Sequence, residues 1–170
     1  MALQQQEKSP GSFVLKDDRR DGGLIEKIIG DIDLPEFYHD ISELEGIELI
    51  QGSHFIDRPH YDKKEQIMCA IDGQLDIVLV PHINRQEVYA GESLLESPYD
   101  NSQSGGESGF DQMSVSPVNF FMPKKKIYPH FQGATRELIN LEKGDCIFVP
   151  AFYFHQYQAF HLAQNQHKQY

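Results

Sequence analysis

The sequence predicts a mainly β domain, a barrel or sandwich of short strands, with a short N-terminal helix and one long polar insert. From residue 47 onwards, short runs rich in β-branched and aromatic residues alternate with turn residues, which is typical of such folds. Residues 83–133 interrupt this pattern as a mostly loop-like insert. The chain has 170 residues, enough to bury roughly 70% of its unfolded surface in one core.

The expected strands are identified by their composition and by the turn signals between them. Asp72-Gly73 is a strong signal for a two-residue hairpin loop, so we expect the strands on either side of it to pair. Pro81 cannot donate to a ladder and therefore ends the second of these strands. The expected strands cover residues 47–51, 54–57, 66–71, 75–80, 137–141, 146–149 and 153–160.

The N-terminal region predicts one short amphipathic helix. Apolar residues recur with helical spacing over residues 24–29, and Gly30 supplies a stop signal. The Ser/Gly-rich centre of the insert, residues 97–106, is low in hydrophobicity, and a loop of this length in a compact domain is usually functional or packed on something else. The predicted organisation is a polar arm, 1–22, a domain, 23–163, with its insert at 83–133, and a polar tail, 164–170.

The charge and the cysteines restrict the partners and the compartment. Twenty-six acidic residues against 15 basic ones give a net charge of −11, which argues against nucleic acid as the main partner. No apolar run approaches the roughly 20 residues that span a bilayer. The polar start predicts no secretory signal, although a presequence already removed would leave no trace.

Cys69 and Cys146 lie in apolar segments, so we expect both to be buried free thiols. Free thiols are typical of a reducing intracellular compartment, and we expect the cytoplasm in preference to an organelle. The alternative is a disulfide between the two cysteines.

A candidate metal site begins with His60-Tyr61-Asp62. In a strand, residues i and i+2 point to the same face, so His60 and Asp62 can present an imidazole and a carboxylate to one point. With a histidine from a returning strand they would form a facial triad suited to Fe(II) and oxygen. His155 is the best candidate for this third ligand because it follows a Gly-Asp turn and an apolar strand. His130 and His161 are weaker candidates for the same position. The alternative is an ordinary surface or hydrogen-bonded His-x-Asp pair.

Several motifs resemble those of JmjC-type, cupin-like oxygenases. Pro59 to Asp62, followed by Glu65 to Gly73, resembles the metal-binding strand and hairpin of this family. The branch that contains the asparaginyl hydroxylase of hypoxia-inducible factor is the most similar. The similarity covers roughly residues 30–160, with motifs in compatible order. The further matching segments are 32–35, 79–81, 116–119, 128–131 and 141–156.

The resemblance implies a fold, a cofactor and a reaction. The fold would be a double-stranded β-helix, the jelly-roll barrel of the cupins, holding Fe(II) through His60, Asp62 and His155. In the family 2-oxoglutarate chelates the metal, and a protein or another substrate is hydroxylated or demethylated. Gln66 lies where the family often has a polar residue near the metal, and its role is unassigned. Tyr157 either lines the substrate-binding site or is an ordinary residue of the core.

Two positions depart from the family pattern. Leu75 replaces the lysine that typically pairs with the distal carboxylate of 2-oxoglutarate, and Asp57 replaces a hydroxyl residue that often assists it. Arg58 and Arg85 are the candidates to substitute. The short C-terminus also leaves no evident strand to close the barrel. Two hypotheses follow: an Fe(II)- and 2-oxoglutarate-dependent oxygenase, or a catalytically degenerate cupin that serves as a structural or interaction subunit of a larger assembly.

Overall fold

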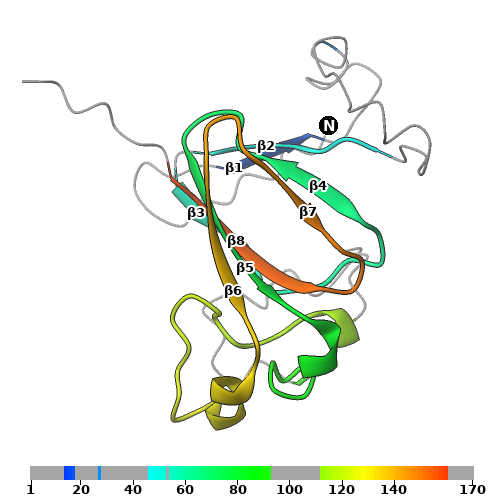
Figure 1. Ribbon diagram of the computed structural model, residues 1–170, viewed down its shortest axis with the longest axis vertical. Coiled ribbons are helices and arrows are strands. Elements are labelled where there is room, and N and C mark those ends of the chain that lie inside the picture. Colours follow the sequence, from blue (N-terminus) through cyan, green and yellow to red (C-terminus); the bar gives the residue numbers. More distant parts are fainter. Residues whose placement is uncertain (1–13, 18–26, 28–45, 53, 93–111, 161–170) are drawn as a thin grey trace, which may run out of the picture. The chain divides into compact units, whose positions relative to one another are not determined.

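The computed structural model describes residues 14–17, 27, 46–52, 54–92 and 112–160. The chain divides into two compact units, Met1–Phe55 and Ile56–Tyr170. In the first unit, β1 (Val14–Asp17) pairs antiparallel with β2 (Leu49–Gly52) (Figure 1). Strand β1 therefore lies within the segment predicted to be a polar arm.

The remaining strands form the mainly β architecture that the sequence predicts. The larger sheet has the strand order β3-β8-β5-β6, and β4 and β7 form a separate antiparallel pair. Strand β5 pairs antiparallel with both β6 and β8. The strands are β3 (His54–Ile56), β4 (Gln66–Cys69), β5 (Gln74–Val80), β6 (Glu137–Glu142), β7 (Cys146–Val149) and β8 (Phe154–Phe160).

The hairpin predicted at Asp72-Gly73 is wrong. The chain does turn there, with Gly73 at φ 77°, but β4 pairs with β7 instead of β5. The reason is that the β4–β7 ladder continues into the turns: the Ala70 N–H donates to the Asp145 carbonyl at 3.0 Å, and the Gly144 N–H donates to the Ala70 carbonyl at 2.7 Å. The backbone groups that a β4–β5 hairpin needs are thus already used. The chain instead crosses from one sheet to the other at both turns.

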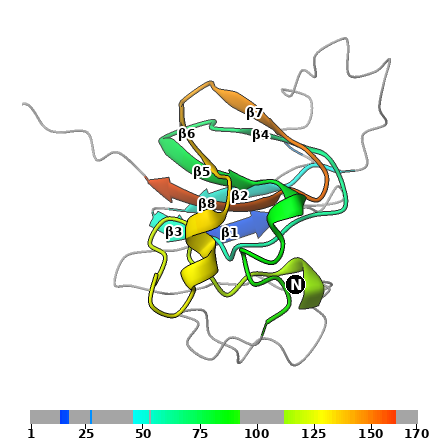
Figure 2. The same cartoon turned by 60° about the horizontal axis from the view of Figure 1, so that its bottom comes forward.

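The two faces of the larger sheet have different neighbours. Figure 2 shows the β4–β7 pair on one side of β5 and β8, and the short 3-10 segments of the insert on the other. These segments are η2 (His82–Asn84), η4 (Gln112–Ser114) and η5 (Pro129–Gly133). As predicted, the described part of the insert contains no long helix or strand.

The insert supplies much of the hydrophobic core. Its side chains pack on the sheet face that carries Val78, Val80 and Phe154, and burial of each large apolar side chain contributes about 1.5–3 kcal/mol. The buried amide of Gln156 accepts a hydrogen bond from the Phe120 N–H at 2.7 Å, which anchors the insert to β8. The insert residues in this core are Val88, Val118, Phe120 and Phe131, and Ala134 follows directly after the insert.

The prediction of two buried free thiols is wrong. Cys69 and Cys146 form a disulfide, and both residues are exposed. They lie directly opposite each other in the β4–β7 register, on the outward face of that pair. The composition of each segment predicted burial, but only the pairing of the two strands brings the sulfur atoms together. The cysteines therefore no longer support a reducing compartment, and the compartment stays a prediction.

Some expectations fall outside the described residues. The helix expected over residues 24–29 is described only at Lys27, which is helical and exposed. The polar tail 164–170 and His161 are not covered. Within the described part of the chain, no helix is long and apolar enough to cross a membrane.

The disulfide generates a prediction about stability. It closes a loop with a sequence separation of 77, and removing such a link typically costs about 2–4 kcal/mol of the free energy of unfolding. Urea unfolding of the oxidised protein, of the reduced protein and of the Cys69→Ala/Cys146→Ala double variant measures this cost. We expect the last two to match each other and to unfold at lower urea. Two titratable thiols in denatured, unreduced protein would contradict the disulfide.

Candidate metal centre

A backbone bridge holds the first and third predicted ligands side by side. The His60 N–H donates to the His155 carbonyl at 3.1 Å, and the His155 N–H donates to the His60 carbonyl at 2.8 Å. The Phe152 N–H also donates to the Asp62 carbonyl at 2.7 Å. Reciprocal bonds of this kind define a directly opposed antiparallel pair, so the two side chains share one face. Their ring centroids lie 4.5 Å apart.

The insert holds the same segment from its other edge. His60 forms a second antiparallel bridge, with Val115. The Tyr61 N–H donates to the Ser114 carbonyl at 2.9 Å, and the Ser116 N–H donates to the Pro59 carbonyl at 2.9 Å. The segment that carries His60 and Asp62 therefore lies between β8 and the insert, although it is not a named strand itself.

The three predicted ligand side chains converge on one point. Asp62 Oδ2 lies 3.5 Å from His60 Nε2 and 3.7 Å from His155 Nε2. Among the described residues, these are the ligand-type side chains whose atoms come together, all within 4.8 Å of one another. Both histidines are buried, and Asp62 is partly exposed. The structure thus brings together His60, Asp62 and His155, whose role as metal ligands stays a prediction.

Backbone carbonyls determine which nitrogen each imidazole presents. His60 Nδ1 lies 2.7 Å from the Arg58 carbonyl, and His155 Nδ1 lies 3.1 Å from the Tyr153 carbonyl. A carbonyl oxygen only accepts, so each Nδ1 carries the hydrogen. In the neutral imidazole this leaves the lone pair on Nε2, the atom that faces Asp62. A hydrogen bond from the second ring nitrogen to a carbonyl is the usual way in which metal-binding histidines are oriented.

The pKa values reflect this crowding of two imidazoles around one carboxylate. Burial lowers the pKa of His60, but the hydrogen bond to Asp62 and the charge of Asp57 outweigh it and leave that pKa raised. The hydrogen bond with His60 lowers the pKa of Asp62. Burial, followed by the charge on His60, lowers the pKa of His155 to about 4. Because metal ligands bind in their deprotonated forms, a bound cation would compete with protons at these groups.

Two further side chains contact the triad. Gln66 Nε2, at the start of β4, donates a hydrogen bond to Asp62 Oδ2, which gives the unassigned Gln66 a contact with a predicted ligand. Asp57 Oδ2 lies 3.8 Å from His60 Nδ1. Asp57 was expected only to depart from the family pattern, and its contact with His60 was not predicted. Its position three residues before His60 was the available signal for this contact.

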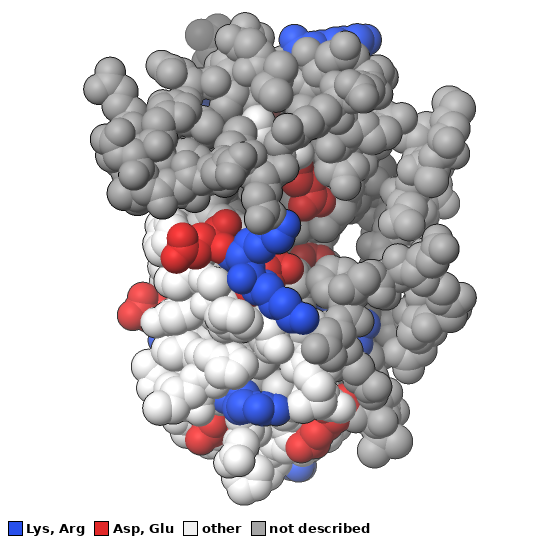
Figure 3. All heavy atoms as spheres, turned by 90° about the vertical axis from the view of Figure 1, so that its right-hand side faces the viewer, with Lys and Arg blue, Asp and Glu red and all other residues white. Residues whose placement is uncertain are grey.

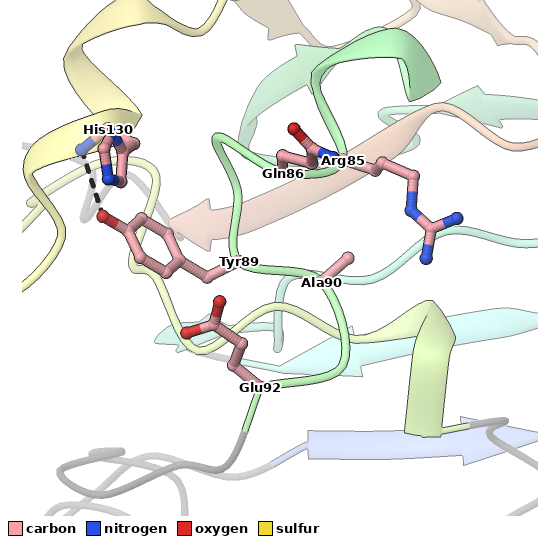
Figure 4. A pocket seen from close by; sticks show the side chains of 6 residues that line it. All are labelled: Arg85, Gln86, Tyr89, Ala90, Glu92 and His130. Carbon is pink, nitrogen blue, oxygen red and sulfur yellow. Dashed lines mark hydrogen bonds between the residues drawn. The ribbon is translucent and has the colours of Figure 1, made fainter.

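The other candidate residues take different positions. Arg58 contributes its carbonyl to His60, and Tyr157 is buried with its ring stacked 6.5 Å from that of His155. Arg85 and His130 line a separate cavity with Tyr89, whose hydroxyl accepts a hydrogen bond from the His130 N–H (Figure 4). His130 is therefore not part of the triad.

The donor set fits a divalent metal. Two imidazole nitrogens and one carboxylate oxygen on one side of an ion form the facial triad of mononuclear Fe(II) sites, which leaves positions for a cosubstrate and oxygen. The Nε2 lone pairs of His60 and His155 are aimed at the shared point, and Gln66 holds the Asp62 oxygen beside them. The residues present therefore suit an Fe(II) ion.

A mainly β fold of this kind, with two histidines and an aspartate converging on one point, is typical of a cupin. The chain belongs to the Cupin-like domain family, which matches residues 22–167. The resemblance to JmjC-type cupin-like proteins is thereby confirmed.

Two proteins of known name are similar in sequence to this chain. Human tRNA wybutosine-synthesizing protein 5 is 26% identical over 144 residues, which are 82% of this chain and 39% of that protein. Lysine-specific demethylase JMJ31 of Arabidopsis thaliana is 24% identical over 147 residues, which are 84% of this chain and 24% of that protein. The chain thus spans well under half the length of these relatives.

A metal titration tests the triad directly. We expect the purified chain to bind one Fe(II) or Mn(II) ion under anaerobic conditions, and Asp62→Asn to weaken binding at least about a hundredfold, because even outer contacts of a metal site cost 10–100-fold. The matched control is Asp76→Asn, which alters a carboxylate bonded to Asn140 and Gln158 on the opposite sheet face. Calorimetry gives both values. Equal losses in the two variants would contradict the site.

The lowered pKa of His155 predicts a pH dependence of stability in metal-free protein. Between pH 6.5 and about 4 the unfolded chain takes up a proton that the native His155 does not, so stability falls as the pH falls through this window. The full shift corresponds to roughly 3 kcal/mol. His155→Asn keeps a donor for the Tyr153 carbonyl but does not titrate. In urea unfolding, the free energy of unfolding should fall less steeply with falling pH for this variant than for the control His130→Asn, which changes an exposed histidine. The same pH dependence in both variants would contradict the assignment.

Proposed function

We propose that this chain is a mononuclear Fe(II)-dependent oxygenase of the 2-oxo-acid class that acts on a protein side chain. The observation that supports this most is the orientation of the triad. Both Nδ1 atoms are committed to carbonyls, and both Nε2 atoms and one Asp62 oxygen face a single point. Membership of the Cupin-like domain family and similarity to a demethylase add to it.

The residues around the triad would divide the work of such an enzyme. His60, Asp62 and His155 would hold the ion, and the ion supplies the activation of oxygen that side chains alone do not provide. In the overall reaction, one oxygen atom enters the substrate C–H bond, and the other enters the carboxylic acid that remains when the 2-oxo acid loses CO2. Gln66 would restrict rotation of the Asp62 carboxylate. The Arg58 and Tyr153 carbonyls fix the orientation of the two imidazole rings.

A protein is the substrate class that the charge favours. One relative is named for tRNA wybutosine synthesis and another for lysine demethylation, so both kinds of substrate occur among similar proteins. This chain carries a net charge of −11. In the face shown in Figure 3, the described Lys and Arg side chains form small groups flanked by Asp and Glu, without the broad basic surface typical of nucleic-acid binding.

Leu75 and Asp57 favour a second candidate, a cupin that keeps the fold, with or without a metal, and serves as a subunit of an assembly. An apolar side chain and a carboxylate at these positions are unsuited to binding 2-oxoglutarate. The two candidates differ in whether the metal-loaded protein consumes a 2-oxo acid at all.

Release of CO2 from carboxyl-labelled 2-oxo acids distinguishes them. We expect slow, Fe(II)-dependent and oxygen-dependent release even without the protein substrate, faster release when a cell-derived protein fraction is added, and loss of both with His155→Ala. His130→Ala is the matched control because His130 lines a different cavity. Stoichiometric metal binding without CO2 release from any 2-oxo acid tested would contradict the oxygenase and support the subunit.

A further inference from the structure

The strand register shows which side chains share the face of the triad. In the antiparallel β5–β8 pair, Leu79 lies opposite His155, Ile77 opposite Tyr157 and Leu75 opposite Ala159. Directly opposed residues project to the same face, and so do residues two apart along a strand. Leu75 is therefore on the face of His155, roughly 13 Å further along the strand by the rise of about 3.3 Å per residue.

This face is apolar beyond His155. Strand β6 adds Ile139 opposite Ile77 and Leu141 opposite Leu75. Leu141, Ile77 and Tyr157 are 5%, 0% and 4% exposed. On β5, β6 and β8 the register gives this face no basic residue, and its acidic residue, Glu137, is exposed at the end beside Leu79.

The β4–β7 pair presents an apolar surface to the same site. Gln66 contacts Asp62, which shows that its face of β4 is the one directed to the triad. Met68 shares this face, with Ile147 as its partner, and Val149 lies opposite Gln66. The opposite face carries the exposed Ile67 and Phe148 and the disulfide. Both sheets therefore direct apolar side chains to the side on which the triad lies.

Of the described basic residues, Arg58 gives its carbonyl to His60 Nδ1, and two others have positions away from this face. Lys143 is exposed and forms an ion pair with Asp72 at 3.3 Å, between the two crossing turns. Arg85 lines the separate cavity of Figure 4. On the triad itself, Asp57 adds negative charge 3.8 Å from His60. A dicarboxylate would have to bury its distal charge against leucine and isoleucine, which is strongly unfavourable.

We propose that the cosubstrate is a 2-oxo acid with an apolar side chain, of the branched aliphatic kind, and not 2-oxoglutarate. Its 2-oxo carboxylate end would lie at the triad, and its side chain would lie against Leu75, Ile77 and Leu141. This inference rests on the proposed function, and it assigns to Leu75 the selection between the two kinds of acid.

The test is a binding measurement that needs no turnover. Protein loaded with Fe(II) under anaerobic conditions is titrated with 4-methyl-2-oxopentanoate and with 2-oxoglutarate, and affinity is followed by calorimetry and by the visible absorption of the chelate. We expect the branched acid to bind at least about tenfold more tightly, the scale on which apolar pockets discriminate side chains. Equal or tighter binding of 2-oxoglutarate would overturn the proposal.

Two substitutions at one position sharpen the result. Leu75→Lys places a cation on the triad face and should reverse the preference, while Leu75→Met, which stays apolar, should retain it. Melting curves check that both variants fold, and Leu75→Arg replaces Leu75→Lys if the lysine variant does not fold. A folded Lys or Arg variant that still prefers the branched acid to 2-oxoglutarate would overturn the proposal. Binding of 2-oxoglutarate in place of the branched acid would overturn this inference alone, and binding of neither acid would count against the proposed function too. Absence of metal binding would overturn the proposed function as well.

Discussion

The reciprocal pair of backbone hydrogen bonds between His60 and His155 is the constraint on which the rest of the site depends. These residues are far apart in the sequence, and their N–H and carbonyl groups satisfy each other at 3.1 and 2.8 Å. The bridge places both imidazoles on one face, and the i+2 spacing then brings Asp62 to the same point. The carbonyls two residues before each histidine turn Nε2 towards the carboxylate.

The path of the chain makes this bridge possible. Because the turns at Asp72-Gly73 and Lys143-Gly144 cross between sheets, the strand after Asp62 pairs with the strand before His155. The disulfide links these two strands on their outer face, and Gln66 links β4 to Asp62 on the inner face. The insert completes the arrangement from the other side, because it bonds to the His60 segment and packs on the opposite face of the larger sheet.

The sequence predicted local features well and pairings poorly. Strand positions follow from composition, and His60, Asp62 and His155 were identified from i+2 spacing, from an apolar strand before a histidine, and from family motifs. The β4–β7 pairing and the disulfide depend on long-range register, which no local pattern encodes. The Asp57 and Gln66 contacts are local, three and four residues from their partners, but spacing alone did not show which side chains face each other. A turn signal such as Asp72-Gly73 specifies that the chain reverses, but the competing ladder of Ala70 with Gly144 and Asp145 decides which strands pair.

The central claim is that His60, Asp62 and His155 bind one metal ion through Nε2, Oδ2 and Nε2. Anomalous diffraction from crystals grown with Mn(II), a common substitute for Fe(II), tests it most directly. The account predicts one anomalous peak per chain, at roughly 2.0–2.3 Å from these three atoms, with both Nδ1 atoms still bonded to the Arg58 and Tyr153 carbonyls. A peak at other side chains, or ligation through a histidine Nδ1, would contradict it.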